Sequence, residues 1–362
     1  MTIPTMPGKP RRVLIVDDSK LMQNLMTLII NGAEGFTVAG VAGSAEEGWD
    51  AVEALNPDLV TLDLELPGRH GLKLLARLMR QHPLPVLVVS AFGGPGAENT
   101  IRALELGAND FIEKPDGQAN TLENFTSLLV AALNRAVTSK RAAPSALEQR
   151  PTAAPIRGGY GASLGKMPLI AIGASTGGVP AIQRVMQDLA PHRFPMVVVQ
   201  HMPAGYTAKL AARLATLTGL NVIESAGGER LVPGMAVVAP GGPQHLDVEN
   251  HRGEMICRLR PGPLVSGHSP SVDEMFRSVA KAAGNHAIGV LLTGMGKDGA
   301  EGLLEMRKAG AVTITQSAET CVVNGMPKAA RDIGANIFDI ALDQIGSGIV
   351  SLINDHTRQH SA

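Results

Sequence analysis

Short apolar runs alternate with segments of helical period along most of the chain. In the first third, five runs predict buried parallel strands, at 13–16, 36–41, 59–62, 85–89 and 110–113. After each run, apolar residues recur three and four positions apart, which predicts helices at 19–30, 45–55, 72–81, 98–106 and 122–137. Five repeats of strand then helix predict one doubly wound α/β domain over residues 11–137.

The pattern stops at residues 138–167, which are rich in Ala, Pro, Ser and Gly and have no apolar periodicity. Such a composition predicts a linker. Strand and helix patterns then resume and predict a second doubly wound domain over residues 168–355. Its predicted strands are 169–172, 196–200, 222–223, 236–239, 255–259, 287–292 and 311–315, and its predicted helices begin near residues 179, 206, 269 and 300.

Composition excludes several classes of protein. The 362 residues carry a net charge of -1 and only 3% aromatic residues, which argues against nucleic-acid binding. The two cysteines, Cys257 and Cys321, cannot form a disulfide framework and lack metal-ligand spacing. No apolar run approaches the ~18 residues that span a membrane, and the first twelve residues lack the apolar core of a signal peptide. We therefore expect a cytoplasmic protein that does not insert into membranes.

Polar residues gather where the strands of the first domain end, at Asp17, Asp18, Asp63, Ser90 and Lys114. The carboxyl ends of parallel strands form the ligand-binding edge of such a sheet. Clustered carboxylates need a counter-ion, and Mg²⁺ prefers hard oxygen ligands. This set predicts phosphoryl transfer to Asp63, with Asp17 and Asp18 as metal ligands. Each aspartate alone could equally be a solvated strand end or a helix cap, as Asp18 before Ser19 could be.

The segments VLIVDDS, LVTLDLELPGRHG, VLVVSAFG and GANDFIEKP resemble the signatures of bacterial response-regulator receiver domains. The resemblance implies a flavodoxin-like fold and phosphorylation of Asp63 by a histidine kinase. It also implies Mg²⁺ held by Asp17, Asp18, Asp63 and the Glu65 carbonyl. Ser90, Lys114 and Phe111 are then expected to respond to the phosphoryl group, although spacing alone would make Phe111 a core residue.

In the second domain, the apolar run at 169–172 ends in Gly173-Ala174-Ser175-Thr176-Gly177-Gly178. Gly173, Ser175 and Gly177 fit G-x-S-x-G, the strand–turn–helix that exposes a nucleophilic serine. Amides at the start of the following helix can stabilise an oxyanion. The alternative is a glycine turn that binds phosphate or only reverses the chain.

A serine nucleophile needs a histidine base and a carboxylate that orients it. His201 and Asp298 follow buried strands, but His245, His251 and His268 are rival bases. Asp298 comes just before the helix predicted near residue 300 and could instead be its N-cap. Ser271 is a plausible cap of the helix predicted near residue 269. Along this chain the candidate residues come in the order Ser, His, Asp, whereas in α/β-hydrolases the order is Ser, Asp or Glu, His.

The segments IAIGASTGG, VVVQHMP, APGG, HSPSVDEMF, GVLLTGMGKDGA and TITQ resemble the catalytic domain of chemotaxis protein-glutamate methylesterases. The resemblance implies a Rossmann-like esterase domain in which Ser175 is the nucleophile, His201 the base and Asp298 the carboxylate. It also implies oxyanion donors in the main chain near Thr176 and Met295.

The substrate of such an enzyme would be receptors that carry glutamate methyl esters. Ester hydrolysis would need no cofactor. Deamidation of receptor glutamines could use the same site. Family members often carry a basic residue between the His and the Pro of the HSPSVDEMF segment, whereas this chain has Ser269 at that position. The alternatives are an output domain that only binds a partner, a DNA-binding output, or hydrolysis of a different ester or amide.

Overall fold

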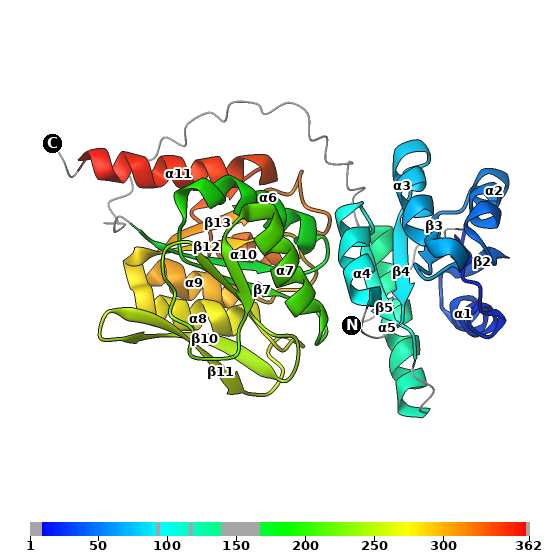
Figure 1. Ribbon diagram of the computed structural model, residues 1–362, viewed down its shortest axis with the longest axis horizontal. Coiled ribbons are helices and arrows are strands. Elements are labelled where there is room, and N and C mark those ends of the chain that lie inside the picture. The colour runs from blue at the N-terminus through cyan, green and yellow to red at the C-terminus, as the bar shows by residue number, and fades with distance from the viewer. Residues whose placement is uncertain (1–8, 92–94, 116–118, 139–166, 360–362) are drawn as a thin grey trace. The chain divides into compact units, whose positions relative to one another are not determined.

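The computed structural model describes residues 9–91, 95–115, 119–138 and 167–359, so residues 139–166 of the predicted linker lie outside the described residues (Figure 1). The chain divides into two compact units, residues 1–146 and 147–362. Each unit contains a parallel sheet with helices on both faces, as the alternating pattern predicts.

The first unit is a five-stranded parallel sheet in the order β2-β1-β3-β4-β5. Helices α1 and α5 pack on one face, and α2, α3 and α4 lie on the other (Figure 1). The strands are β1 (Arg11–Val16), β2 (Phe36–Ala42), β3 (Leu59–Leu62), β4 (Val86–Ser90) and β5 (Asp110–Glu113). The helices are α1 (Lys20–Gly32), α2 (Ala45–Leu55), α3 (Gly71–Gln81), α4 (Pro95–Glu105) and α5 (Ala119–Thr138).

Local chemistry sets these boundaries. The last four residues of β1 are almost fully buried, as expected for a central parallel strand covered on both faces. The Ser44 side chain accepts a hydrogen bond from the Glu47 amide and begins α2, and Asn56 ends it in the left-handed conformation. The order of the strands reverses between β1 and β3, so Asp17 and Asp63 follow the two strands that flank this switch point.

The second unit is a seven-stranded parallel sheet in the order β14-β13-β12-β6-β7-β9-β8, beside a separate antiparallel pair, β10 and β11. The strands are β6 (Leu169–Ala174), β7 (Met196–Gln200), β8 (Asn221–Glu224), β9 (Met235–Val238), β10 (Gln244–His251), β11 (Glu254–Pro261), β12 (Ala287–Leu291), β13 (Val312–Gln316) and β14 (Phe338–Ile340). The helices are α6 (Gly178–Leu189), α7 (Tyr206–Thr218), α8 (Val272–Ala283), α9 (Ala300–Lys308), α10 (Met326–Asp332) and α11 (Leu342–Gln359).

Helices α8 and α9 cover one face of this sheet, and α6, α7 and α11 cover the other (Figure 1). Phe276 and Val279 of α8 are completely buried against the sheet, and each such side chain contributes about 1.5–3 kcal/mol of hydrophobic stabilisation. The switch point lies between β6 and β12, the strands that precede Ser175 and Asp298. The fold therefore carries both residues to the ligand-binding edge of the sheet.

The helical and strand pattern did not predict β10, β14, α10 or α11. Strand β10 has the sequence QHLDVENH, and among the described strands it pairs with β11. In that pair His245 lies opposite Arg260, Asp247 opposite Arg258 and Glu249 opposite Ile256. Both strands of the pair mix polar and apolar residues, unlike the apolar runs of the central sheet. In the described part of the chain, no helix is long and apolar enough to cross a membrane.

Candidate active site and acidic cluster

Ser175 stands in a tight turn between β6 and α6. Its amide donates to the Thr293 carbonyl at 3.0 Å, and its carbonyl accepts from the Gly178 amide at 2.7 Å and the Gln200 side chain at 2.9 Å. Gly177 has φ +77°, and a Cβ at Gly294 would lie 2.8 Å from the Ser175 Cβ. The glycines of this region are therefore required by backbone conformation and by close approach to the serine.

Strand register brings His201 beside the serine turn. Ala174 of β6 pairs with Gln200 of β7, so Ser175 and His201 are the next residues on adjacent parallel strands. The His201 amide donates to the Ala174 carbonyl at 3.1 Å, and Gln200 Nε2 donates to the carbonyls of both Ser175 and His201. Gln200, which the sequence did not single out, thus ties the two turns together.

The His201 and Asp298 side chains form a hydrogen bond within the buried edge of the sheet. His201 Nε2 lies 2.8 Å from Asp298 Oδ2, and the two side chains are 7% and 1% exposed. An ionised carboxylate only accepts hydrogen bonds, so Nε2 carries the proton and Nδ1 presents its lone pair. His201 Nδ1 has no hydrogen-bond partner among the described residues, and it is not hydrogen-bonded to Ser175. An imidazole in this tautomer can accept a proton at Nδ1.

Asp298 is held by the start of α8. Its two oxygens accept hydrogen bonds from the Ser271 hydroxyl at 2.7 Å, the Val272 amide at 2.7 Å and the Asp273 amide at 3.1 Å, in addition to His201. Burial alone would raise the pKa of Asp298, but these donors outweigh it and lower the pKa to about 2. Asp298 is not the N-cap of the following helix, because that cap is Gly299.

The other three candidate bases differ from His201 in the groups around them. His245 is buried, and it lies 2.9 Å from the Pro263 carbonyl through Nε2 and 3.2 Å from the Ser271 amide through Nδ1, so both ring nitrogens are engaged. His251 lies on the exposed end of β10. His268 stacks on the His201 ring with centroids 3.7 Å apart. His201 is the histidine that contacts Asp298.

The amides of Thr176 and Met295 flank the serine turn. The Thr176 carbonyl accepts from the Thr293 hydroxyl at 3.0 Å, and Gly294 pairs with the segment at 323–326. Among the described residues, neither amide donates to another group of the chain. Unused amides beside a serine are the groups that an oxyanion site requires.

A second buried carboxylate, Asp273, lies beside Asp298. Its Oδ1 accepts from the Gly302 amide at 2.7 Å. Burial raises its pKa to about 6; the Gly302 amide opposes this rise, and the negative charge of Asp298 adds to it. Because this carboxyl binds its proton more tightly in the folded protein than in the unfolded chain, its own contribution to stability is most favourable below about pH 4 and is lost as the pH rises from about 4 to 6.

Replacing Asp273 by asparagine should therefore stabilise this unit at neutral pH. The amide can keep the contact with Gly302 and carries no charge, so we expect the free energy of unfolding to rise by on the order of 2–3 kcal/mol at pH 7.5 and far less at pH 4.5. Calorimetric unfolding at both pH values tests this, with the exposed Asp332→Asn as control. A loss of stability in Asp273→Asn that is equal at both pH values would contradict the expectation.

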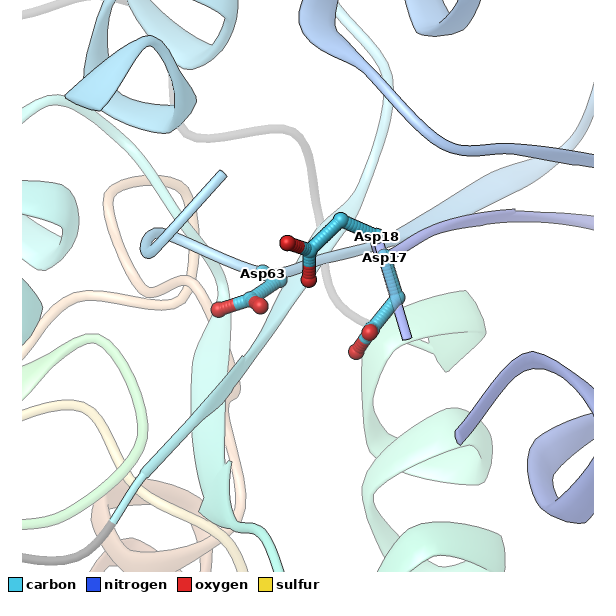
Figure 2. A group of neighbouring side chains, drawn as sticks. All are labelled: Asp17, Asp18 and Asp63. Carbon is cyan, nitrogen blue, oxygen red and sulfur yellow. The ribbon is translucent and has the colours of Figure 1, made fainter. Parts of the chain in front are cut away.

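In the first unit, Asp17, Asp18 and Asp63 each offer one carboxylate oxygen within 4.8 Å of the others. Figure 2 shows these side chains gathered at neighbouring strand ends. Lys114 Nζ lies 2.9 Å from Asp17 Oδ2 and 2.7 Å from Asp63 Oδ2. Burial would lower the pKa of Lys114, but its hydrogen bonds to Asp63 and Asp17 outweigh this and raise it. Burial also raises the pKa of Asp17, against the opposing effect of Lys114.

The remaining predicted residues surround this acidic cluster. The Glu65 amide donates to Asp63 Oδ1 at 2.9 Å, which brings the main chain of residue 65 beside the carboxylate. Ser90 is fully buried at the end of β4, and Phe111 is half-buried on β5. Three carboxylates near one ammonium leave unbalanced negative charge, which fits a divalent cation that prefers oxygen ligands.

Comparisons with known proteins agree with this division of the chain. The CheB methylesterase family matches residues 170–349, and the response regulator receiver domain family matches residues 13–125. The protein-glutamate methylesterase/protein-glutamine glutaminase 1 of Caulobacter vibrioides is 45% identical over 341 residues, 94% of this chain and 97% of that protein.

The corresponding enzyme of Chromohalobacter salexigens is 42% identical over 94% of this chain and 95% of its own length. The crystal structure of the Thermotoga maritima CheB methylesterase catalytic domain is 34% identical, with a TM-score of 0.50, over 51% of this chain and 98% of that chain.

Proposed function

Because this chain belongs to the CheB methylesterase family and carries a receiver domain, we propose that it is a phosphorylation-activated hydrolase of chemotaxis receptors. It removes methyl groups from receptor glutamates for sensory adaptation, and it deamidates receptor glutamines at the same site. The observation that carries the proposal is the buried His201–Asp298 pair next to Ser175. We assign the reaction to a cytoplasmic enzyme whose units span residues 11–137 and 168–355, joined by a linker at 138–167.

In the proposed reaction, Ser175 Oγ attacks the carbonyl carbon of the ester and His201 Nδ1 takes the hydroxyl proton. The carbonyl oxygen becomes negative and accepts hydrogen bonds from the Thr176 and Met295 amides. Asp298 stabilises the resulting imidazolium. When the tetrahedral intermediate collapses, the bond to the methoxy oxygen breaks, His201 returns the proton and methanol leaves.

Water then attacks the acyl-enzyme with His201 again as base, and the bond to Ser175 Oγ breaks. The products are the free glutamate carboxylate and the regenerated serine. An amide forms the same tetrahedral intermediate and releases ammonia in place of methanol. Deamidation of glutamine therefore needs no additional residue.

In the receiver domain, Asp63 is the proposed phosphoryl acceptor for a histidine kinase of the chemotaxis pathway. Asp17, Asp18, Asp63 and the Glu65 carbonyl would hold Mg²⁺, which, when bound, neutralises negative charge around the transferred phosphoryl group. Lys114 would exchange its contact with Asp63 Oδ2 for a phosphoryl oxygen. Ser90 would donate to a second phosphoryl oxygen, and the Phe111 side chain would shift with it.

Methanol release from receptor membranes tests the proposed activity. The purified chain should release methanol from membranes whose receptors carry methyl esters, and a small phosphodonor with Mg²⁺ should increase the rate. Membranes from cells without the receptor methyltransferase are the control and should release none. Absence of release from methylated membranes, with and without phosphodonor, would refute the receptor-ester assignment.

A further inference from the structure

Ser271 occupies an unusual position, because one hydroxyl joins the start of α8 to the carboxylate of the active site. It is completely buried. Its Oγ accepts from the Glu274 amide at 3.4 Å, as an N-cap does, and donates to Asp298 Oδ1 at 2.7 Å. An N-cap needs only the acceptor role. The second bond, to an ionised carboxylate, is the shorter of the two and is charge-assisted.

The orientation of Ser271 is itself set by a buried histidine. The Ser271 amide can only donate, so His245 Nδ1 accepts from it. The Pro263 carbonyl can only accept, so His245 Nε2 carries the proton. His245 is therefore neutral with one defined tautomer. It connects the segment after β11 to the residue that contacts Asp298.

From these contacts we infer that Ser271 is a positioning residue of the hydrolase, which acts through Asp298 on the basicity and orientation of His201. The inference rests on the proposed function, in which His201 is the base. Each Asp298 oxygen accepts two hydrogen bonds: Oδ1 from Ser271 and the Asp273 amide, Oδ2 from the Val272 amide and His201. This sharing limits how strongly the carboxylate attracts the proton on His201.

Removing the Ser271 hydroxyl leaves Asp298 with one donor fewer and hence a stronger acceptor for His201 Nε2–H. The imidazolium is then stabilised relative to the neutral base, so the acid limb of the pH–rate profile moves to higher pH. Oδ1 also loses its shortest contact, which loosens the orientation of the carboxylate. We expect kcat to fall about tenfold with KM unchanged, because the contact acts on the base and not on the substrate.

Two substitutions separate this role from simple helix capping. Ser271→Ala removes both the cap and the contact with Asp298, whereas Ser271→Gly removes the contact but leaves a residue that is well tolerated at an N-cap. If Ser271 positions Asp298, both variants shift the acid limb upward by about half a pH unit or more. Both also lose the stability of the contact with Asp298, and Ser271→Ala loses the contribution of the cap in addition. If Ser271 is only a cap, Ser271→Gly behaves like the wild type.

Ser278→Ala is the matched control on the same helix. The Ser278 hydroxyl donates to the Met275 carbonyl at 2.7 Å and accepts from the Val248 amide of β10 at 2.9 Å. Its loss should lower the melting temperature and leave both kcat and the acid limb unchanged.

Other titratable groups around Asp298 are His201, the carboxyl of Asp273 on α8, and His268, which stacks on His201. Because burial raises the pKa of Asp273 to about 6, the Ser271 comparison is repeated in an Asp273→Asn background. The shift of the acid limb should persist there.

A measurement without substrate decides the inference independently of the proposed function. The proton between His201 and Asp298 should give a low-field NMR signal, which its absence in His201→Gln would assign. In Ser271→Gly the signal should move further downfield, because the His201–Asp298 hydrogen bond strengthens. An unchanged signal together with an unchanged acid limb would overturn the role of Ser271. Methanol release that is absent, or independent of Ser175, would instead refute the proposed function, and the NMR signal would still decide the role of Ser271.

Discussion

Ser175→Ala should lower methanol release from receptor membranes by on the order of 10⁴-fold or more, with the fold retained. Alanine has no oxygen to form the acyl-enzyme, and what remains is the slow hydrolysis that the Thr176 and Met295 amides can promote. The fold should persist, because the Ser175 hydroxyl bonds to no group of the described chain, while its amide and carbonyl keep their contacts.

The measurement is methanol release per enzyme, with circular dichroism to show that the variant is folded. Ser347→Ala is the control, since the Ser347 hydroxyl donates only to the Gln344 carbonyl within α11. Ser347→Ala should release methanol at the wild-type rate. A rate near that of the wild type in Ser175→Ala would remove the serine from the mechanism and favour a water-mediated or partner-binding role for this unit.

Asp63→Asn should abolish both phosphoryl incorporation from a small phosphodonor and the increase in methanol release that the phosphodonor causes. The amide is a far poorer nucleophile than the carboxylate, and it removes one negative charge from the site where Asp17 and Asp18 would share the cation. Release without phosphodonor should remain at the basal rate, because Asp63 and Ser175 belong to different units.

Incorporation of a labelled phosphoryl group that is released by alkali or hydroxylamine, as an acyl phosphate is, tests the acceptor directly when measured with Mg²⁺ present. The exposed Asp50→Asn on α2 is the control and should be labelled like the wild type. Labelling that persists in Asp63→Asn would place the acceptor at another residue. Loss of labelling with continued activation would separate the switch from phosphorylation.

The sequence alone determined the two α/β sheets and most elements within them. Apolar runs such as 13–16 and 196–200 are buried on both faces, and few other structures can cover both faces of such a run. The helix at 45–55 was predicted with its observed bounds, because its helical period ends at Asn56-Pro57. In the structure Asn56 ends the helix in the left-handed conformation and Ser44 caps its start. These features depend on residues close in the chain, so the pattern contains them.

The tertiary structure decided which polar residues meet. From spacing alone, four histidines were possible bases and Asp298 was a possible cap of the helix after it. In the fold, the Asp298 carboxylate instead accepts hydrogen bonds from the residues at the start of α8 and contacts His201. The antiparallel strand β10 and the contact between Ser271 and Asp298 also escaped prediction. Strand β10 is joined to β11 by the two residues Arg252 and Gly253, and it escaped prediction because its mixed polar and apolar residues do not form an apolar run. The contact between Ser271 and Asp298 joins residues 27 positions apart, which only the packing of α8 against the edge of the sheet brings together, so no local pattern encodes it.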